Sequence, residues 1–463
     1  MQEAANIDIE FVECAEDGAS EKYALMVASN DLTDLIWEEN ANASRTATSG
    51  YTGGLDKAVE DEVYLNLTKL LPEKIPNYYS YLMEYPELKR DLTTDEGNIV
   101  VVAQITQPGA YVEQGGFVSN ALLEATNTEM PATVEEWYDF WLKVKQEDLV
   151  ECPSRFTSMG AGTGFGVGVA AAYGTTDSST FLVDIESGEV FYAQTQDAFR
   201  DYMEFVAKCY DQGIIHNEFY NLPTDMGDVM AGRFGTFIGN ISFVTNQLQG
   251  YSAAPAPYLE SSGYTHSIMT SYTSMVYKTC CWIAISANTE KLDTVCTWLD
   301  YMYSDEGIDL ANFGYEEGVS YEIVDGQKQF TEIMDDRNME KDLRYVQDLT
   351  MYEGPSFTYA NLAYVIASDE AKAMYEILNS DDGSHALYSS LPNISLTVEE
   401  AEATSDSLAD IETYVSEMIL KFETGEVALT DEAWAEYLDT INGFGLDAVT
   451  EAYQVAYERY LSR

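Results

Sequence analysis

The sequence predicts an α/β protein of two lobes joined by a hinge, with a helix-rich C-terminal part. Its 463 residues are too many for one ordinary core but suit two α/β lobes, and a hydrophobic content of 46% can fill both. Short apolar runs with the length of buried strands alternate with helical periodicity as far as Gln327. Beyond Gln327 the pattern is largely helical, which predicts the helix-rich part.

The stretch Cys280–Gly318 shows the α/β pattern most clearly. Trp282–Ser286 is an apolar run of strand length, and Trp282 is expected in the core. The polar turn Asn288–Lys291 follows and can begin a helix. The expected helix reaches Tyr303, and its apolar face recurs at helical spacing through Leu292, Val295, Leu299 and Met302, with Trp298 widening that face.

The N-terminal region predicts further strands and helices in turn. Strands are expected at Ile7–Cys14, at the end of Asp31–Trp37 and at Asn98–Ile105, whose continuous apolar run suits a strand buried on both faces. Helical periodicity is expected over Glu21–Ala28 and Pro72–Leu88.

The middle and the end of the chain add recognisable helix boundaries. Thr133 and Glu136 form a capping box, and Phe199–Gln212 is an amphipathic helix that ends at Gly213. A strand is expected at Gly235–Ile238. The later helices are predicted at Leu343–Tyr352, Asn361–Asn379, Val398–Glu423 and Asp431–Leu461.

Several phrases carry a resemblance to a known family. They are DYMYSDEG at Asp300–Gly307 with the turn Gly314–Gly318, MPATVEEW at Met130–Trp137, GIIHNEF at Gly213–Phe219, and the tail at Ala452–Tyr460. In this order they resemble the family 1 extracellular solute-binding proteins, the maltose-binding-protein-like receptors of bacterial sugar ABC importers. The resemblance covers nearly the whole chain and implies a type II periplasmic-binding-protein fold.

The chain order predicts how the two lobes are divided. We expect the first lobe at 1–106 plus 256–318, and the second at 107–255 plus 319–463 with the C-terminal helices. Hinge segments are expected near Ile105–Pro108, Ser252–Pro257 and Gly314–Gly318.

The resemblance also implies a function. It implies capture of a carbohydrate, an oligosaccharide in particular, between the lobes and delivery to a membrane ABC permease. The protein would be a monomer without enzymatic activity or cofactor, outside the cell or in the periplasm, with a lipid anchor in its precursor. Two alternatives stay open: a secreted carbohydrate-active enzyme, and a peptide-binding lipoprotein of the same fold.

Aromatic residues after predicted strands are the expected ligand contacts, because Tyr and Trp offer an apolar face with a polar handle, and ligands in α/β sheets sit beyond the carboxyl ends of strands. Trp37 is the strongest candidate, since stacking Trp residues of maltose-binding relatives follow the equivalent strand. The full set of candidates is Trp37, Tyr51, Phe156, Phe165, Asn240, Phe243 and Tyr315.

Composition excludes other classes of function. A net charge of −57, from 80 acidic and 23 basic residues, repels nucleic acid and anionic membrane surfaces. The three histidines and six cysteines form no zinc pattern, and no G-x-S-x-G motif is present. The G-x-G-x-x-A motif at Gly166–Ala171 follows no convincing strand, so we do not read it as a phosphate site. Asp225 and Asp228 are expected in a solvated turn.

Overall fold

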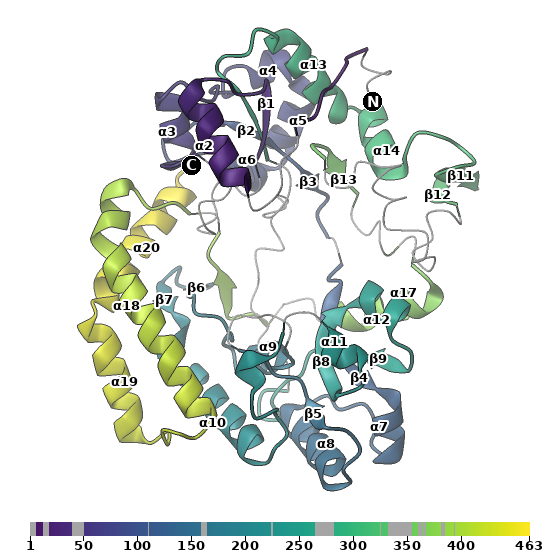
Figure 1. The fold of residues 1–463 in the computed structure, drawn as a ribbon, viewed down its shortest axis with the longest axis vertical. Helices are drawn as coiled ribbons and strands as arrows, with labels where there is room; N and C mark the ends of the chain where they lie inside the picture. Colours follow the sequence, from purple (N-terminus) through teal and green to yellow (C-terminus); the bar gives the residue numbers. More distant parts are fainter. Residues whose placement is uncertain are drawn as a thin grey trace.

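The computed structural model describes residues 6–12, 18–38, 51–109, 111–158, 164–223, 226–263, 282–324, 326–331, 354–359, 364, 367–380, 385–392 and 394–463. Figure 1 shows two bodies, one above the other, with segments of the chain running between them. The predicted helix at Leu343–Tyr352 lies outside the described residues.

The upper body in Figure 1 contains the first sheet, with strand order β1–β10–β2 and antiparallel neighbours. Its strands are β1 (Leu35–Glu38), β10 (Trp282–Ile285) and β2 (Val101–Ala103). Helices surround it: α2 (Ala19–Ser29), α3 (Gly54–Glu60), α4 (Leu71–Lys74), α5 (Pro76–Glu84), α6 (Pro86–Leu92), α13 (Leu292–Met302) and α14 (Asp305–Phe313).

The lower body contains a four-stranded sheet of order β5–β8–β4–β9. Its strands are β5 (Cys152–Ser154), β8 (Phe234–Asn240), β4 (Gln114–Ser119) and β9 (Tyr251–Ala253). Its helices are α7 (Asn120–Ala125), α8 (Val134–Gln146), α9 (Gly166–Ala172), α10 (Asp197–Asp211), α11 (Gly227–Met230), α12 (Ile241–Gln247) and α17 (Asp369–Leu378), with two 3₁₀ turns at Ala193–Thr195 and Phe219–Asn221.

The C-terminal helices stand along one side of the lower body beside a small sheet (Figure 1). They are α18 (Val398–Glu423), α19 (Asp431–Gly443) and α20 (Leu446–Leu461), and the sheet consists of β14 (Tyr388–Ser390), β6 (Phe181–Asp184) and β7 (Val190–Tyr192). Two short pairings complete the fold: β3 (Ile105–Thr106) with β13 (Phe357–Thr358), and the hairpin of β11 (Tyr321–Val324) and β12 (Gln327–Phe330).

Each body has its own hydrophobic core. The first sheet and its helices bury Trp282 and Trp298 together with neighbouring aliphatic residues, and the second body buries Trp137 and Trp141. A third cluster packs Phe117 and residues of β8 against α12 and α17. The predicted α/β fold with a helix-rich C-terminal part is therefore present.

The predicted elements agree with the structure best where capping and apolar spacing coincide. The capping box at Thr133 and Glu136 is formed in both directions, with both N–H···O distances 3.1 Å. The helix predicted over Phe199–Gln212 is α10, and Gly213 follows it with a φ of 66°, a left-handed conformation that glycine adopts without strain.

One predicted element was wrong: the expected strand at Ile7–Cys14 is absent over the described part, 6–12. The stretch Pro72–Leu88 is helical, as predicted. It is divided into three short helices, because Pro76 and Pro86 each begin a new helix and cannot donate a backbone hydrogen bond to the one before.

The packing suggests two changes to the predicted lobe boundaries. Residues 256–263 lie with the second body, where Val134 N donates to Tyr258 O at 2.8 Å. Segments after 318 lie with the first body: Phe313 of α14 contacts Phe330 of β12, at 5.4 Å between ring centroids, and Phe357 belongs to the first core. The boundaries themselves remain a proposal.

Among the described helices, none combines the length and the apolar composition that crossing a membrane requires.

Trp298 tests the first core. Its side chain is buried on the inner face of α13, as the sequence predicted. We expect Trp298→Ala to lower the free energy of unfolding by about 3–5 kcal/mol, because it removes buried apolar surface and leaves a cavity. Chemical denaturation measures this, with the exposed neighbour change Thr297→Ala as control. Equal midpoints for both variants would contradict the assignment.

A buried acidic pair lies inside the second body. Asp177 and Glu423 line a cavity of about 10 Å³, room for one water, beside Thr157 and Tyr202. Burial, with a smaller contribution from the charge of the nearby Asp177, raises the pKa of Glu423 to about 8. Burial also raises the pKa of Asp177 to about 6, against the opposing hydrogen bond from Ser178. Native Glu423 therefore holds a proton that the unfolded chain releases near pH 4.5.

This pair makes stability depend on pH. Between pH 4.5 and about 8 the native state binds more protons than the unfolded state, so the free energy of unfolding falls as pH rises. The slope approaches about 1.4 kcal/mol per pH unit for one proton. We expect Glu423→Gln to flatten that slope in urea titrations at several pH values. The exposed Glu417→Gln on the same helix is the control, and an unchanged slope in Glu423→Gln would refute the assignment.

Candidate functional site

The strand registers show which sheet edges lie at the two ends of the segment that crosses from the first lobe to the second, between β2 and β4. In the first sheet Trp37 pairs with Ile283 and Ile283 with Val102, so the carboxyl ends of β1 and β2 lie at the same edge. From that edge the chain continues through β3 and reaches the start of β4, where Gln114 pairs with Asn240. The crossing therefore joins the edge that carries Trp37 to the edge that carries Asn240.

Tyrosines fix the point where the chain leaves the first sheet. Ala103, the last residue of β2, donates its N–H to the hydroxyl of Tyr78 at 3.1 Å and accepts at its carbonyl from Tyr303 at 2.5 Å. The next residue, Gln104, is buried and donates to the hydroxyl of Thr358 at 2.9 Å. The crossing thus starts next to a residue, Ala103, whose N–H and carbonyl are both fixed by hydrogen bonds to tyrosine side chains.

Trp37 has the exposure that a stacking residue needs. It is next to last in β1, and 46% of its surface is exposed although Ile36 before it is buried. An indole held on a strand and open to solvent can cover the apolar face of a ligand without reorganising the core.

Tyr51 is partly engaged by its own lobe. Its hydroxyl donates to Asp61 Oδ2 at 2.6 Å, and its ring contacts Tyr64 edge-on, 6.4 Å between centroids. The hydrogen bond to the Asp61 carboxylate raises the pKa of Tyr51. A ligand could contact this ring only beside those existing partners.

The end of β8 presents Asn240 and Phe243. Asn240 is exposed and caps α12, since its Oδ1 accepts from Ser242 N at 3.2 Å. Phe243, in the first turn of α12, is half-buried and meets Phe237 edge-on at 6.5 Å. These two candidates share one strand end.

Phe156 and Phe165 are core residues, and we leave them out of the proposed site. Only 3% and 2% of their surfaces are exposed, and both rings pack edge-on against Trp141. A Cβ at Gly116 of β4 would lie 2.9 Å from the ring of Phe165. Sequence reasoning placed these rings beside a loop but could not show that both rings pack into the core.

Tyr315 is the most exposed of the aromatic candidates, at 62%. It follows α14 and Gly314, whose φ is 85°, so it belongs to the first body. Within the described part of the chain, no strand register joins it to Trp37 or Asn240.

Sequence reasoning missed an aromatic cluster on the crossing itself. Tyr111 is 38% exposed, and its ring contacts Tyr364 at 4.8 Å and Tyr375 at 6.2 Å between centroids. The neighbouring Val112 is bonded on both sides by Asn379, through its N–H at 2.7 Å and its carbonyl at 3.0 Å. The sequence did contain a signal for this cluster, because Tyr111 lies between the predicted buried strand at Asn98–Ile105 and the next predicted strand.

Two other features proved structural. Gly166–Ala171 lies within the short buried helix α9, where a Cβ at Gly166 would lie 2.7 Å from the hydroxyl of Tyr202. Close packing therefore accounts for this glycine. The expectation of a solvated turn at Asp228 was wrong, because the residue is buried and pairs with Arg155 at 3.0 Å; Asp225 lies outside the described residues.

Within the described part of the chain, no three His, Cys, Asp or Glu side chains lie together as metal ligands would. Cys152, Cys209 and Cys296 are buried free thiols. Burial raises the pKa of Cys152 to about 12, so this thiol is unreactive near neutral pH.

Comparison with known proteins gives relatives at low identity. No family model matches the chain. The fructooligosaccharide ABC transporter substrate-binding protein FusA of Streptococcus pneumoniae serotype 4 (strain ATCC BAA-334 / TIGR4) is 22% identical over 321 residues. That match covers 66% of this chain and spans only 56% of the length of FusA.

Solved structures match over almost the full length. FusA of S. pneumoniae in complex with kestose has a TM-score of 0.73 at 18% identity, with 100% of this chain and 94% of that chain covered. A human-milk-oligosaccharide-binding (HMO-binding) solute-binding protein of Bifidobacterium longum infantis ATCC 15697 has a TM-score of 0.72 at 16% identity, covering 99% and 94%. The alginate-binding protein AlgQ2 has 0.68 at 20%, covering 95% and 88%.

These matches confirm the resemblance that the sequence phrases indicated. They extend over both bodies and over the C-terminal helices, so they concern the whole arrangement and not one lobe. The chain has the fold of the extracellular solute-binding proteins that serve carbohydrate ABC transporters.

Proposed function

We propose that the protein is the extracellular substrate-binding component of an ABC importer and that it captures an oligosaccharide between its two lobes. The observation that carries the proposal is the full-length fold match to proteins whose names describe oligosaccharide binding, FusA with kestose and the HMO-binding protein. The strand registers support it, because they set an exposed Trp37 and an exposed Asn240 on the two edges that one crossing joins.

The proposed site combines one stacking side chain from each lobe with polar groups at strand ends. Trp37 belongs to the first lobe, and Tyr111 stands where the chain enters the second. Asn240 offers an amide, and Phe243 borders it. Aromatic rings suit the C–H faces of sugar rings and amides suit their hydroxyls, so the set fits a carbohydrate better than an ion.

Partners and location follow from the same proposal. The protein would deliver its ligand to a membrane permease and would work outside the cell as a monomer, tethered by a lipid in its precursor. The charge of −57 argues against nucleic acid as a partner. The runner-up functions are a secreted carbohydrate-active enzyme and a peptide-binding protein of this fold. A glycosidase would need two carboxylates facing each other across a sugar site.

A ligand screen tests the function. We expect members of a panel of kestose and longer fructooligosaccharides, human milk oligosaccharides and alginate oligosaccharides to raise the melting temperature without being cleaved. A ligand at 100 times its dissociation constant adds about 2.7 kcal/mol of stability. Product formation, followed by chromatography, would favour the enzyme. A shift with peptides and with no glycan of the panel would favour the peptide-binding protein.

Trp37→Ala tests the site once a ligand is known. We expect the change to weaken binding by about 1–3 kcal/mol, the free energy of burying a large apolar side chain, and to leave the melting curve of the free protein unchanged. Isothermal titration calorimetry measures the affinity. Tyr220→Ala, which removes another exposed aromatic side chain from the second lobe, is the matched control. An affinity equal to wild type in Trp37→Ala would remove this residue from the site.

A further inference from the structure

The C-terminal helix α20 belongs to the second lobe over most of its length. Val449 is buried in the second core, and the ring of Tyr453 stacks on Phe181, with 4.3 Å between centroids. The side chain of Gln454 accepts from the backbone N–H of Val190 in β7 at 2.7 Å. Up to this point the helix is a fixed part of that lobe.

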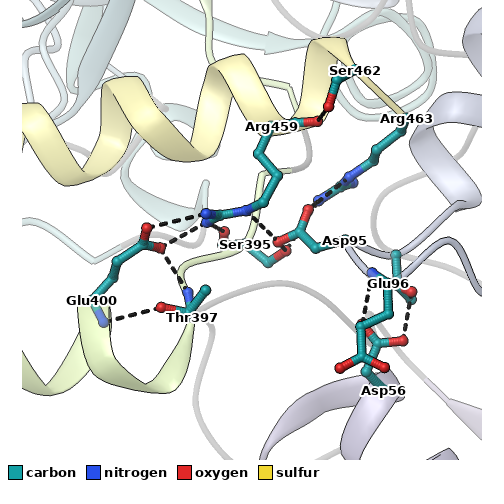
Figure 2. Close-up of polar contacts among 10 residues, drawn as sticks. Asp56, Asp95, Glu96, Ser395, Thr397, Glu400, Arg459, Ser462 and Arg463 are labelled. Carbon is teal, nitrogen blue, oxygen red and sulfur yellow. Dashed lines mark hydrogen bonds and ion pairs between the residues drawn. The ribbon is translucent and has the colours of Figure 1, made fainter.

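The last turn of α20 contacts the first lobe instead. Arg459 donates to Asp95 Oδ2 at 3.0 Å, and Arg463 donates to Asp95 Oδ1 at 2.5 Å (Figure 2). Between them, the hydroxyl of Tyr460 donates to Asp91 at 2.5 Å. We call the contact of Arg459, Tyr460 and Arg463 with Asp91 and Asp95 the C-terminal junction.

The first lobe holds its side of this junction in place. Asp91 lies in α6, and Asp95 lies in the turn that follows it. Asp56 of α3 fixes that turn, because its carboxylate accepts from the hydroxyl of Thr94 at 2.5 Å and from the side chain of Asn98 at 2.8 Å. It also accepts from the N–H of Glu96 at 3.4 Å (Figure 2).

The second lobe holds its own side equally firmly. Arg459 also donates to both carboxylate oxygens of Glu400, at 2.7 and 3.1 Å, and to the carbonyl of Ser395 at 3.0 Å. The same Glu400 closes the capping box of α18 through the N–H of Thr397 at 2.8 Å. The hydroxyl of Ser395 donates to Asp95 at 2.8 Å. The arginine therefore ties the start of α18 and the end of α20 to one aspartate.

Basic side chains gather at the junction in a chain that has few of them. Arg90, whose guanidinium lies 5.8 Å from the ring of Tyr460, joins Arg459 and Arg463. These three bases lie beside the acids Asp91, Asp95 and Glu400, in a chain with 80 acidic and only 23 basic residues.

The junction is also shielded from solvent. The side chains of Arg463 and Asp95 are 4% and 16% exposed. Hydrogen bonds with charged partners are stronger than neutral ones, and salt screens partly buried charges less than exposed ones. The junction is therefore a contact that ordinary ionic strength does not remove.

Partial burial acts to raise the pKa of Asp95, but hydrogen bonds from Ser395 and Arg463 and the charges of both arginines hold it below its ordinary value. The carboxylate is therefore ionised at neutral pH. This contribution to stability is present above the ordinary pKa of 3.8 and is lost as pH falls below it.

Among the described residues, the lobes are joined at two separate places. One is the chain crossing that leaves the first lobe beside the pairing of β3 with β13, where Ile105 N donates to Ser356 O at 3.0 Å. The other is the C-terminal junction, which lies on the opposite side of the upper body in Figure 1, where the C-terminus is marked. Two separated fixed points leave one rotation, about the line through them, whereas a single fixed point would leave rotation about all three axes.

We propose that the C-terminal junction is a second pivot of the hinge, which limits the motion of the lobes to rotation about the axis through it and the β3–β13 pairing. The physical contact stands on the geometry alone. Its consequence for ligand capture rests on the proposed function, because a ligand between the lobes binds best when one rotation brings both halves of the site together.

The experiment measures the distance between the lobes in the free protein and so needs no ligand. Spin labels carried by non-natural amino acids replace Met83 of α5 and Met230 of α11, both exposed, so the native cysteines stay unlabelled. We expect Asp95→Asn to broaden the distance distribution from pulsed electron resonance and to enlarge the radius of gyration from X-ray scattering. Asp431→Asn, which breaks the Arg200–Asp431 pair inside the second lobe, is the matched control and should leave both unchanged.

A second variant keeps the test decisive if Asp95→Asn does not fold. Arg463→Gln removes the partner of Asp95 that is least exposed and leaves Arg459 in place, and it should broaden the distance distribution in the same way. Folding is checked by circular dichroism and melting. Distributions equal to wild type in a folded variant would overturn the second pivot without touching the proposed ligand function. A failed glycan screen would reject the ligand function and leave the pivot standing.

Discussion

The arrangement of this molecule depends on one constraint: the backbone leaves one hydrophobic core through β2 and enters another through β4, with few residues between. Buried tyrosines hold Ala103 at the exit, and pairing with Asn240 holds Gln114 at the entry. The ends of neighbouring strands lie at the same edge of a sheet. The positions of Ala103 and Gln114 therefore also determine which side chains of the neighbouring strands lie near the crossing. The position of Trp37 is set by its register with Ile283 in β10, which in turn pairs with Val102 in β2.

Sequence reasoning worked where local chemistry decides structure. The capping box at Thr133, the apolar face of α13 and the glycine after α10 each need only a few neighbouring residues, and each is present. It failed where distant packing decides. The sequence around Phe156 and Phe165 is typical of a loop with aromatic residues. Both rings are core residues because Trp141 of α8, which is distant from Phe165 in the sequence, packs against them. Similarly, the residues next to Asp228 in the sequence do not indicate that it pairs with the buried Arg155.

Exposed and buried acidic residues play different parts in this structure. Most acids are solvated and repel one another, which favours solubility and keeps anionic partners away. The few basic side chains are then informative by position. Arg155 neutralises a carboxylate in the second core, and Arg459 with Arg463 neutralises the acids where α20 meets the first lobe. At Glu423 and Asp177, by contrast, burial raises the pKa values of both carboxyl groups.

These features bear on how a two-lobed receptor could signal its ligand. A ligand changes the arrangement of the lobes only if it binds one arrangement more tightly than another. Loaded and empty protein are then easiest to distinguish when the free protein has few arrangements. A chain crossing alone would restrain distance but not direction. A contact on the far side that pairs arginines with a partly buried carboxylate restrains direction as well, at the cost of ordering a few side chains. Arg459 and Arg463 supply that contact with two of the 23 basic residues of the chain.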